Sequence, residues 1–389
     1  MENLTFPKTV STIDRINKRN KIRRNYSNIK QNILLYKNEE SSNDEKKEYE
    51  SKKKEMESIQ NLKEYLIKNN ALKEDFELLD FVDSGGESNV YSIQINYKHK
   101  SGQNLKKKAI LKVIFDNRKN NQNEHKREAI IAAKLKNRNI INFLGYSIID
   151  PKESCLMVLD EARYGNVRNF QRKILNRPVF SESMINYICY QVLNALQYCH
   201  RCKIAHMDLK LQNIVADEYL NFKLIDFSIS LNYQNKNPND DIKLPSRGTN
   251  FYIPLEVLKS KTIKVKELNK VDLYSLGVVL YNLAFGNYPY QMTYGDDSDF
   301  QIIERKLENE KLTFSNEKEY SSYFLDFLSK LLERDIKKRI GLNEALNHYW
   351  TKGADLLMEE KEKAYNVSIF ASYLLTNHIK SFNDYIQMK

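Results

Sequence analysis

The stretch His206–Asn213 reads His-Met-Asp-Leu-Lys-Leu-Gln-Asn, and Asp226–Ser228 follows it as Asp-Phe-Ser. The two segments bring two carboxylates, one amine and one carboxamide into a short loop–strand–loop run. Asp208 can accept the proton of a hydroxyl and aim its oxygen, and Lys210 can offset charge on a transferring phosphoryl group. This pairing of residue types predicts chemistry on phosphate esters.

Asn213 and Asp226 add the hard oxygen ligands that Mg²⁺ prefers. The complete set is suited to moving a phosphoryl group from ATP to a hydroxyl. The two segments resemble the His-Arg-Asp-Leu-x-x-x-Asn and Asp-Phe-Gly motifs of the eukaryotic protein kinases. Two letters differ, because Met207 stands for Arg and Ser228 stands for Gly.

Length and composition agree with this resemblance. The 389 residues leave room for two or three domain-sized units, and 41% of them are hydrophobic, which is enough for a sizeable core. The net charge of +11 raises the alternative of a nucleic-acid or anionic-membrane partner. We favour a solvated mixed surface, because the lysines are interspersed with Asp and Glu and no RNA- or DNA-binding fold signature is present.

The four cysteines, Cys155, Cys189, Cys199 and Cys202, include one Cys-x-x-Cys spacing. No second pair follows at zinc-site spacing, so we expect structural cysteines rather than a metal site or a disulfide. The longest apolar run, 276–285, is too short to span a bilayer. With no secretory signal and Glu2 excluding N-myristoylation, we expect a soluble, intracellular protein of the cytoplasm or nucleus.

The chain divides into three parts by composition. Residues 1–74 are charge-dense and are expected to be partly disordered or helical, with a helix over 43–70 whose thin apolar stripe could dock on the folded domain or on a partner. Residues 75–350 carry the kinase-like motifs. Residues 351–389 are expected to form a helical tail.

The middle part predicts an α+β fold of two lobes. The small lobe, 75–160, is expected to hold an antiparallel sheet and one helix over 124–135, and the larger lobe, 161–350, is expected to be mainly helical. Short runs rich in Val, Ile, Tyr and Leu predict the strands: 76–81, 89–97, 108–115, 142–149 and 155–159.

The resemblance implies an ATP site in the small lobe. The Gly-rich loop falls on 83–90, where Gly85 and Gly86 let the backbone approach phosphates and Val90 would cover adenine. Asp83 and Ser88 replace the outer two glycines of the family motif. A negative charge at this place should weaken nucleotide binding rather than help it.

Ala109-Ile110-Leu111-Lys112 matches the family's Val-Ala-Ile-Lys, so Lys112 would grip the α- and β-phosphates and pair with Glu128 of the following helix. Backbone groups of Asp160 and Ala162 would bind the adenine edge from the hinge between the lobes. Val215 would form the floor of the adenine pocket.

The large lobe carries matching support residues. Thr249 stands where serine/threonine kinases use a hydroxyl to bond the catalytic Asp and Lys, which favours this class over tyrosine kinases. Asp272 is expected to brace the 206–213 loop, and Arg339 is expected to form a structural ion pair with Glu256.

The two residues that differ from the family motifs, Met207 and Ser228, concern regulation. In family members with Arg at the position of Met207, that Arg usually binds a phosphate on the activation segment. We therefore expect activity without such a phosphate, although Ser230, Tyr233, Ser246 and Thr249 remain candidate sites. Ser228 replaces a flexible Gly and should make flipping of the Asp-Phe pair costlier.

The sequence leaves three functions open. The first is an active serine/threonine protein kinase that uses ATP and Mg²⁺ on protein substrates. The second is a weak or inactive pseudokinase that acts as a scaffold or allosteric binder, favoured by the altered Gly-rich loop. The third, a nucleic-acid-binding protein, rests on the basic N-terminal segment alone. Retention of Lys112, Glu128, Asp208, Lys210, Asn213 and Asp226 favours the first, because loss of any one costs large rate factors.

Overall fold

The computed structural model describes residues 76–84, 88–98, 101–115, 124–150, 154–170, 179–245, 249–293, 299–315 and 317–354. The expected N-terminal extension over 1–74, its helix over 43–70 and the helical tail expected beyond residue 354 lie outside the described residues.

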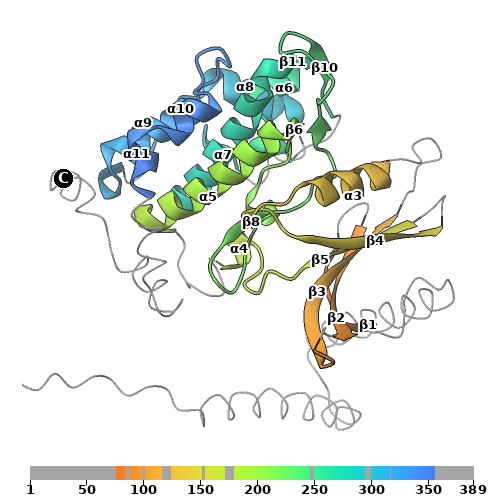
Figure 1. The fold of residues 1–389 in the computed structure, drawn as a ribbon. Coiled ribbons are helices and arrows are strands. Elements are labelled where there is room, and N and C mark those ends of the chain that lie inside the picture. The colour runs from red at the N-terminus through yellow and green to blue at the C-terminus, as the bar shows by residue number, and fades with distance from the viewer. Residues whose placement is uncertain are drawn as a thin grey trace, which may run out of the picture. The chain divides into compact units, whose positions relative to one another are not determined.

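Five antiparallel strands form one sheet in the order β1-β2-β3-β5-β4 (Figure 1). All five expected strands are present. β1, β2, β3 and β5 run further than expected, because pairing between neighbours satisfies the backbone of polar residues that the apolar pattern alone does not mark. The bounds are β1 Phe76–Ser84, β2 Ser88–Lys98, β3 Asn104–Phe115, β4 Phe143–Asp150 and β5 Ser154–Asp160.

The helix expected over 124–135 is present as α3 (Glu124–Lys134), and it packs against one face of this sheet. Its Ala129 and Ala132 pack in one apolar cluster with Ile114 of β3. Successive side chains of a strand point to opposite faces, so Lys112 lies on the same face as Ile114. The alternation therefore turns Lys112 toward the helix.

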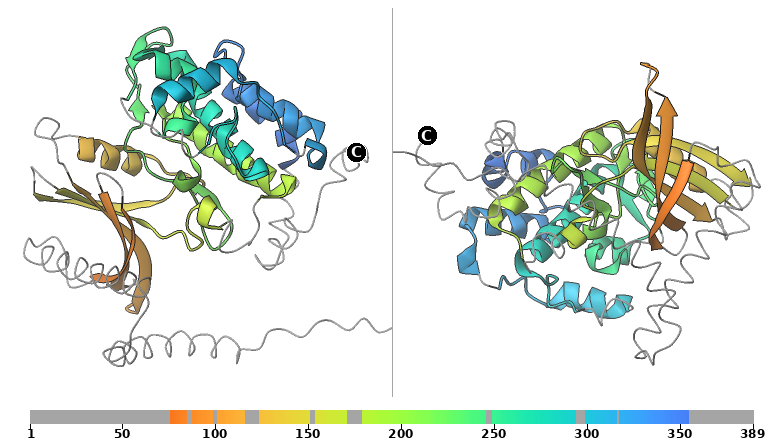
Figure 2. Two further views of the ribbon diagram at one scale, coloured as in Figure 1. Left: turned by 180° about the vertical axis from the view of Figure 1, so that it is seen from behind. Right: turned by 90° about the horizontal axis from the view of Figure 1, so that it is seen from below.

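The rest of the described chain is mainly helical, with three short two-stranded sheets, so the expected two-lobed α+β fold is confirmed (Figure 2). The strand pairs are β6 Ile204–Ala205 with β9 Leu231–Asn232, β7 Ile214–Ala216 with β8 Phe222–Leu224, and β10 Asp241–Lys243 with β11 Thr262–Lys264. The helices are α4 Val167–Phe170, α5 Glu182–Arg201, α6 Leu255–Lys259, α7 Leu268–Phe285, α8 Phe300–Asn309, α9 Ser322–Leu331, α10 Leu342–Leu346 and α11 Tyr349–Lys352. Single 3₁₀ turns are η2 Leu211–Asn213, η3 Asn250–Tyr252, η4 Val265–Glu267 and η6 Glu317–Glu319.

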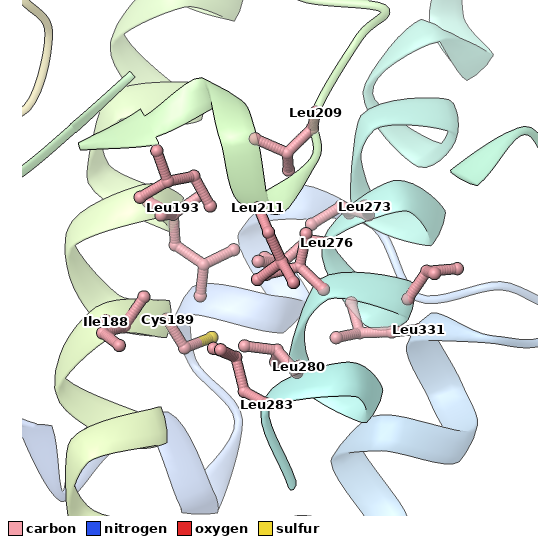
Figure 3. Close-up of a cluster of buried hydrophobic side chains, with 14 of the residues drawn as sticks. Ile188, Cys189, Leu193, Leu209, Leu211, Leu273, Leu276, Leu280, Leu283 and Leu331 are labelled. Atoms are coloured by element: carbon pink, nitrogen blue, oxygen red, sulfur yellow. The ribbon is translucent and has the colours of Figure 1, made fainter. Parts of the chain in front are cut away.

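Helices α5 and α7 lie side by side at the centre of the helical lobe (Figures 1 and 2). Ser181 caps the N-terminus of α5 by accepting a hydrogen bond from the Met184 N–H, and Gly286, with φ of 72°, ends α7. Both helices are buried on almost every side, which is why the second half of α7, over 276–285, is mostly apolar. Their leucines gather in one cluster, joined by Leu331 of α9 (Figure 3).

All four cysteines are free thiols, and three of them are buried, which agrees with a structural role. Within the part of the chain that the structure describes, no helix combines the length and apolar character needed to cross a bilayer.

The expected ion pair forms between Arg339, which lies just before α10, and Glu256 of α6. The Arg339 side chain is fully buried, and its Nη1 and Nη2 donate to the two Glu256 carboxylate oxygens at 2.6 and 3.1 Å. Its remaining N–H groups donate to the carbonyl oxygens of Glu333, Lys270 and Arg334. All five guanidinium donors are thus satisfied.

We expect the Arg339→Met substitution to lower the free energy of unfolding by about 3–5 kcal/mol, because it leaves the Glu256 carboxylate without its partner. Urea denaturation of the purified chain measures this loss. The neighbouring Lys338→Met is the matched control, since Lys338 is exposed and its ammonium lies 4.0 Å from the exposed Asp335 carboxylate. Equal stability losses for both variants would contradict a structural role for the ion pair.

Candidate active site

The 206–213 loop is anchored by apolar residues that alternate with its polar ones. Leu209 and Leu211 are fully buried in the cluster between α5 and α7 (Figure 3). The backbone of Lys210 between them is extended, so its side chain points away from the two leucines. The alternation of Leu with Asp and Lys thereby turns the polar groups out of the core toward one place.

Three side chains hold the Asp208 carboxylate. Its Oδ2 accepts hydrogen bonds from Lys210 Nζ at 2.7 Å and from Asn213 Nδ2 at 3.0 Å. Its Oδ1 accepts from the Thr249 hydroxyl at 2.9 Å, and this hydroxyl itself accepts from Lys210 Nζ at 2.9 Å. Thr249 is 41 residues away in sequence, so the fold brings together the hydroxyl, amine and carboxylate that the motifs predicted.

The backbone just before Asp208 is left-handed. Met207 has φ of 69°, a conformation that costs a residue with a side chain roughly 1–2 kcal/mol. Asp272 of α7 compensates, because its carboxylate accepts the N–H of Met207 at 2.8 Å and the N–H of His206 at 3.0 Å. Asp272 thus braces the loop, as expected.

Lys112 of β3 lies between two carboxylates. Its Nζ is 2.7 Å from Glu128 Oε1 of α3 and 3.0 Å from Asp226 Oδ1. The pair expected from sequence is formed, and the contact with Asp226 links the five-stranded sheet to the segment that follows β8.

The charges of this group reinforce one another. Burial alone would lower the pKa of the Lys112 ammonium, but Glu128 and Asp226 outweigh burial and raise this pKa above its usual value. Burial would raise the pKa of the Asp226 carboxyl, yet the Lys112 ammonium holds it well below its usual range. Both groups are therefore charged at neutral pH.

Asn213 and Asp226 are the candidate metal ligands. Asn213 uses its amide nitrogen as donor to the Asp208 carbonyl at 2.8 Å, so its amide oxygen is the atom suited to a cation. Among the described residues, no three His, Cys, Asp or Glu side chains are grouped to hold a metal by themselves. A carboxylate and an amide fit Mg²⁺, which binds proteins through few side chains and completes its shell with phosphates and waters.

The residues expected around adenine come from three strands. Val90 lies directly opposite Lys112 in the β2–β3 ladder, so the two side chains share one face. Asp160 ends β5, and its side chain forms an ion pair with Lys107 at 2.5 Å. Ala162 follows in a turn where its carbonyl accepts the Gly165 N–H, and Val215 is buried in β7.

The Gly-rich loop and Ser228 are the two places where the sequence departs from the family motifs near the nucleotide. Gly85 and Gly86 lie outside the described residues, while Asp83, which stands in place of a family glycine, is exposed at the end of β1. Ser228 is not among the described residues with positive φ, whereas Asp226 has φ of 65°. The left-handed backbone thus falls on the Asp, and Ser228 meets no such strain in this conformation.

Sequence reasoning missed two contacts at the site. His200 at the end of α5 places its Nε2 2.7 Å from Asp272 Oδ2, and the Arg127 side chain donates to the carbonyl oxygen of Ser230. Neither could be found from sequence, because neither residue belongs to the motifs used and both partners are distant in the chain.

Comparison with known proteins agrees with this geometry. A family model described as the protein kinase domain matches residues 76–351. The carbon catabolite-derepressing protein kinase of Candida glabrata is 28% identical over 267 residues, which cover 69% of this chain and 40% of that protein. Testis-specific serine/threonine-protein kinase 1 of Mus musculus is 28% identical over 228 residues, with coverage of 58% and 59%.

Calcium-dependent protein kinase 5 of Plasmodium berghei is 31% identical over 292 residues, which cover 73% of this chain and 47% of that protein. The matched parts are thus less than two thirds of the length of these relatives. The family match itself extends over well more than half of the chain and contains every motif described above. On that match, the chain belongs to the eukaryotic protein kinase superfamily.

Proposed function

We propose that this chain is a serine/threonine protein kinase that transfers the γ-phosphoryl group of Mg-ATP to hydroxyls of protein substrates. One observation carries the proposal. The carboxylate of Asp208 is within hydrogen-bond distance of Lys210, Asn213 and Thr249, and the N–H of Ile225, next to Asp226, donates to the Asn213 carbonyl at 3.0 Å. Asp226 in turn contacts Lys112. The groups needed for phosphoryl transfer therefore surround one place.

Each group has a distinct role in this proposal. Asp208 orients the acceptor hydroxyl and receives its proton, while Lys210 offsets charge that develops on the transferring phosphoryl. Glu128 holds the Lys112 ammonium, which binds the α- and β-phosphates. Because Lys210 and Thr249 already fix the Asp208 carboxylate, little reorganisation is needed when the hydroxyl arrives.

Nucleotide and metal would be held by the remaining residues. Val90 and Val215 provide apolar surfaces for adenine, and the backbone at Asp160 and Ala162 provides its hydrogen bonds. Gly85 and Gly86 would let the phosphates approach the backbone. Asn213 and Asp226 would hold Mg²⁺, which when bound neutralises charge on the phosphates.

The structure also bears on regulation. Met207 lies in an apolar cluster, here called the segment cluster, in which Tyr233, Ile242 and Leu244 of the 226–245 segment pack against the helical lobe. Two of the four candidate phosphorylation sites are engaged inside the protein: Ser230 donates to the His206 carbonyl at 3.0 Å and Tyr233 is buried. Thr249 is occupied by Asp208. The members of the segment cluster are Ala205, Met207, Tyr233, Ile242, Leu244, Ile263, Val265, Leu268 and Val271.

A pseudokinase remains the second candidate, because Asp83 places a negative charge beside the Gly-rich loop. It differs from the first in one measurable respect, since a scaffold needs no turnover.

The Asp208→Asn substitution should lower kcat by about 10²–10⁴-fold, because the amide cannot accept the hydroxyl proton. The measurement is ATP- and Mg²⁺-dependent phosphorylation of a generic protein substrate. Asp240→Asn, the same change at a segment residue outside the site, should leave kcat unchanged. Equal signals from the parent and Asp208→Asn would refute the enzyme and favour the pseudokinase.

Phosphatase treatment of the purified chain should leave its turnover unchanged within about twofold, because the segment cluster uses apolar contacts where the family commonly uses an Arg–phosphate pair. Mass spectrometry verifies removal of phosphate before the assay. Loss of turnover that phosphorylation of a single segment residue restores would contradict this expectation.

A further inference from the structure

Tyr233 lies on the segment just after β9, and its hydroxyl reaches back to the end of α5. The hydroxyl oxygen is 3.0 Å from His200 Nδ1 and 3.1 Å from the His200 carbonyl oxygen, to which it can donate. The Tyr233 N–H also donates to the Lys203 carbonyl at 2.9 Å. Only 7% of Tyr233 is exposed, so these bonds form away from solvent.

The contacts continue from His200 to the loop of Asp208. The other ring nitrogen, Nε2, is 2.7 Å from Asp272 Oδ2. The same carboxylate accepts the N–H groups of His206 and Met207. Burial would raise the pKa of the Asp272 carboxyl, but the hydrogen bond with His200 outweighs burial and lowers this pKa below its usual value. Asp272 is therefore ionised, and His200 donates its Nε2–H to it.

The other ring nitrogen of His200, Nδ1, can form a hydrogen bond with the Tyr233 hydroxyl whether His200 is neutral or protonated. A neutral His200 accepts the Tyr233 O–H at Nδ1. A protonated His200 donates its Nδ1–H to the hydroxyl oxygen, whose own hydrogen then turns to the His200 carbonyl. The hydroxyl can serve as both donor and acceptor, whereas a phenyl ring can serve as neither.

The chain of contacts ends at a strained residue. Met207 is left-handed and immediately precedes Asp208, so the direction of the Asp208 side chain depends on the bond from the Met207 N–H to Asp272. Met207 and Tyr233 also share the segment cluster. Tyr233 is therefore linked to the loop in two ways, by apolar packing in the cluster that includes Met207 and by the hydrogen bonds that run through His200 and Asp272.

We propose that Tyr233 is a positioning residue for Asp208, acting through His200 and Asp272 to couple the 226–245 segment to the 206–213 loop without a phosphate. The proposal rests on the proposed kinase function and extends it, because it names how the segment holds the catalytic loop in place when it carries no phosphate. It also assigns Tyr233 a role as an anchor rather than as a phosphorylation site.

The test is Tyr233→Phe, which removes only the hydroxyl. We expect kcat to fall about tenfold with an unchanged KM for ATP, because His200 and Asp272 lose orientation while Lys112 and Val90 are untouched. Tyr281→Phe is the matched control. Tyr281 is 4% exposed and its hydroxyl donates to the Thr313 carbonyl at 2.8 Å, away from the loop. This variant should keep the parental kcat.

A second measurement does not depend on turnover. Hydrogen–deuterium exchange of the peptide that covers His206 and Met207 should be faster in Tyr233→Phe than in the parent and in Tyr281→Phe, because Asp272 accepts both amide hydrogens. Unchanged exchange in Tyr233→Phe would overturn the proposal whether or not the chain has activity.

A double variant tests the route. If Tyr233 acts through His200, then Tyr233→Phe combined with His200→Gln should lower kcat no further than His200→Gln alone. Multiplied losses would overturn the route, and so would an unchanged kcat in Tyr233→Phe. Failure of the proposed function has a separate sign, namely parental turnover equal to that of Asp208→Asn.

Discussion

The Asp272 carboxylate is the constraint on which the candidate site depends. It accepts two consecutive backbone N–H groups, and one of them belongs to the left-handed Met207. A strained residue persists only where its surroundings hold it, and here a buried, ionised carboxylate of α7 does so. Because Asp208 is the next residue, the bonds to Asp272 decide where the carboxylate of Asp208 points.

A second constraint joins the sheet to this loop. Lys112 contacts Glu128 of α3 and Asp226 of the large lobe with one ammonium group, so one side chain of β3 ties α3 to the candidate metal ligand. An ion pair between surface residues holds two elements together only weakly, because water and salt screen its charges. Lys112 and Glu128 are mostly buried, so their attraction is screened less. Apolar packing in the segment cluster supports the same loop at Met207.

Much of this arrangement could be predicted from the chain alone. The order and spacing of the motifs placed Lys112 with Glu128, Asp208 with Lys210 and Thr249, and Arg339 with Glu256, and each of these contacts is present. The sequence tied the cost of flipping to Ser228, but residue type does not tell which residue of Asp-Phe-Ser takes the positive φ, and it falls on Asp226. Tyr233 was one of four candidate phosphorylation sites, and a tyrosine in a polar stretch gives no sign of the burial that the structure shows.

Residue patterns along the chain specify which chemical groups this protein has and in which lobe each one lies, because period-2 and period-3.6 patterns and motif spacing are local properties. How these groups support one another depends on the way the chain packs in three dimensions. The contacts from Tyr233 to His200, Asp272 and Met207 join residues far apart in the chain. Such contacts depend on how α5, α7 and the 226–245 segment pack. Hydrophobic packing brings polar side chains together, but no pattern in the sequence indicates which ones will become partners.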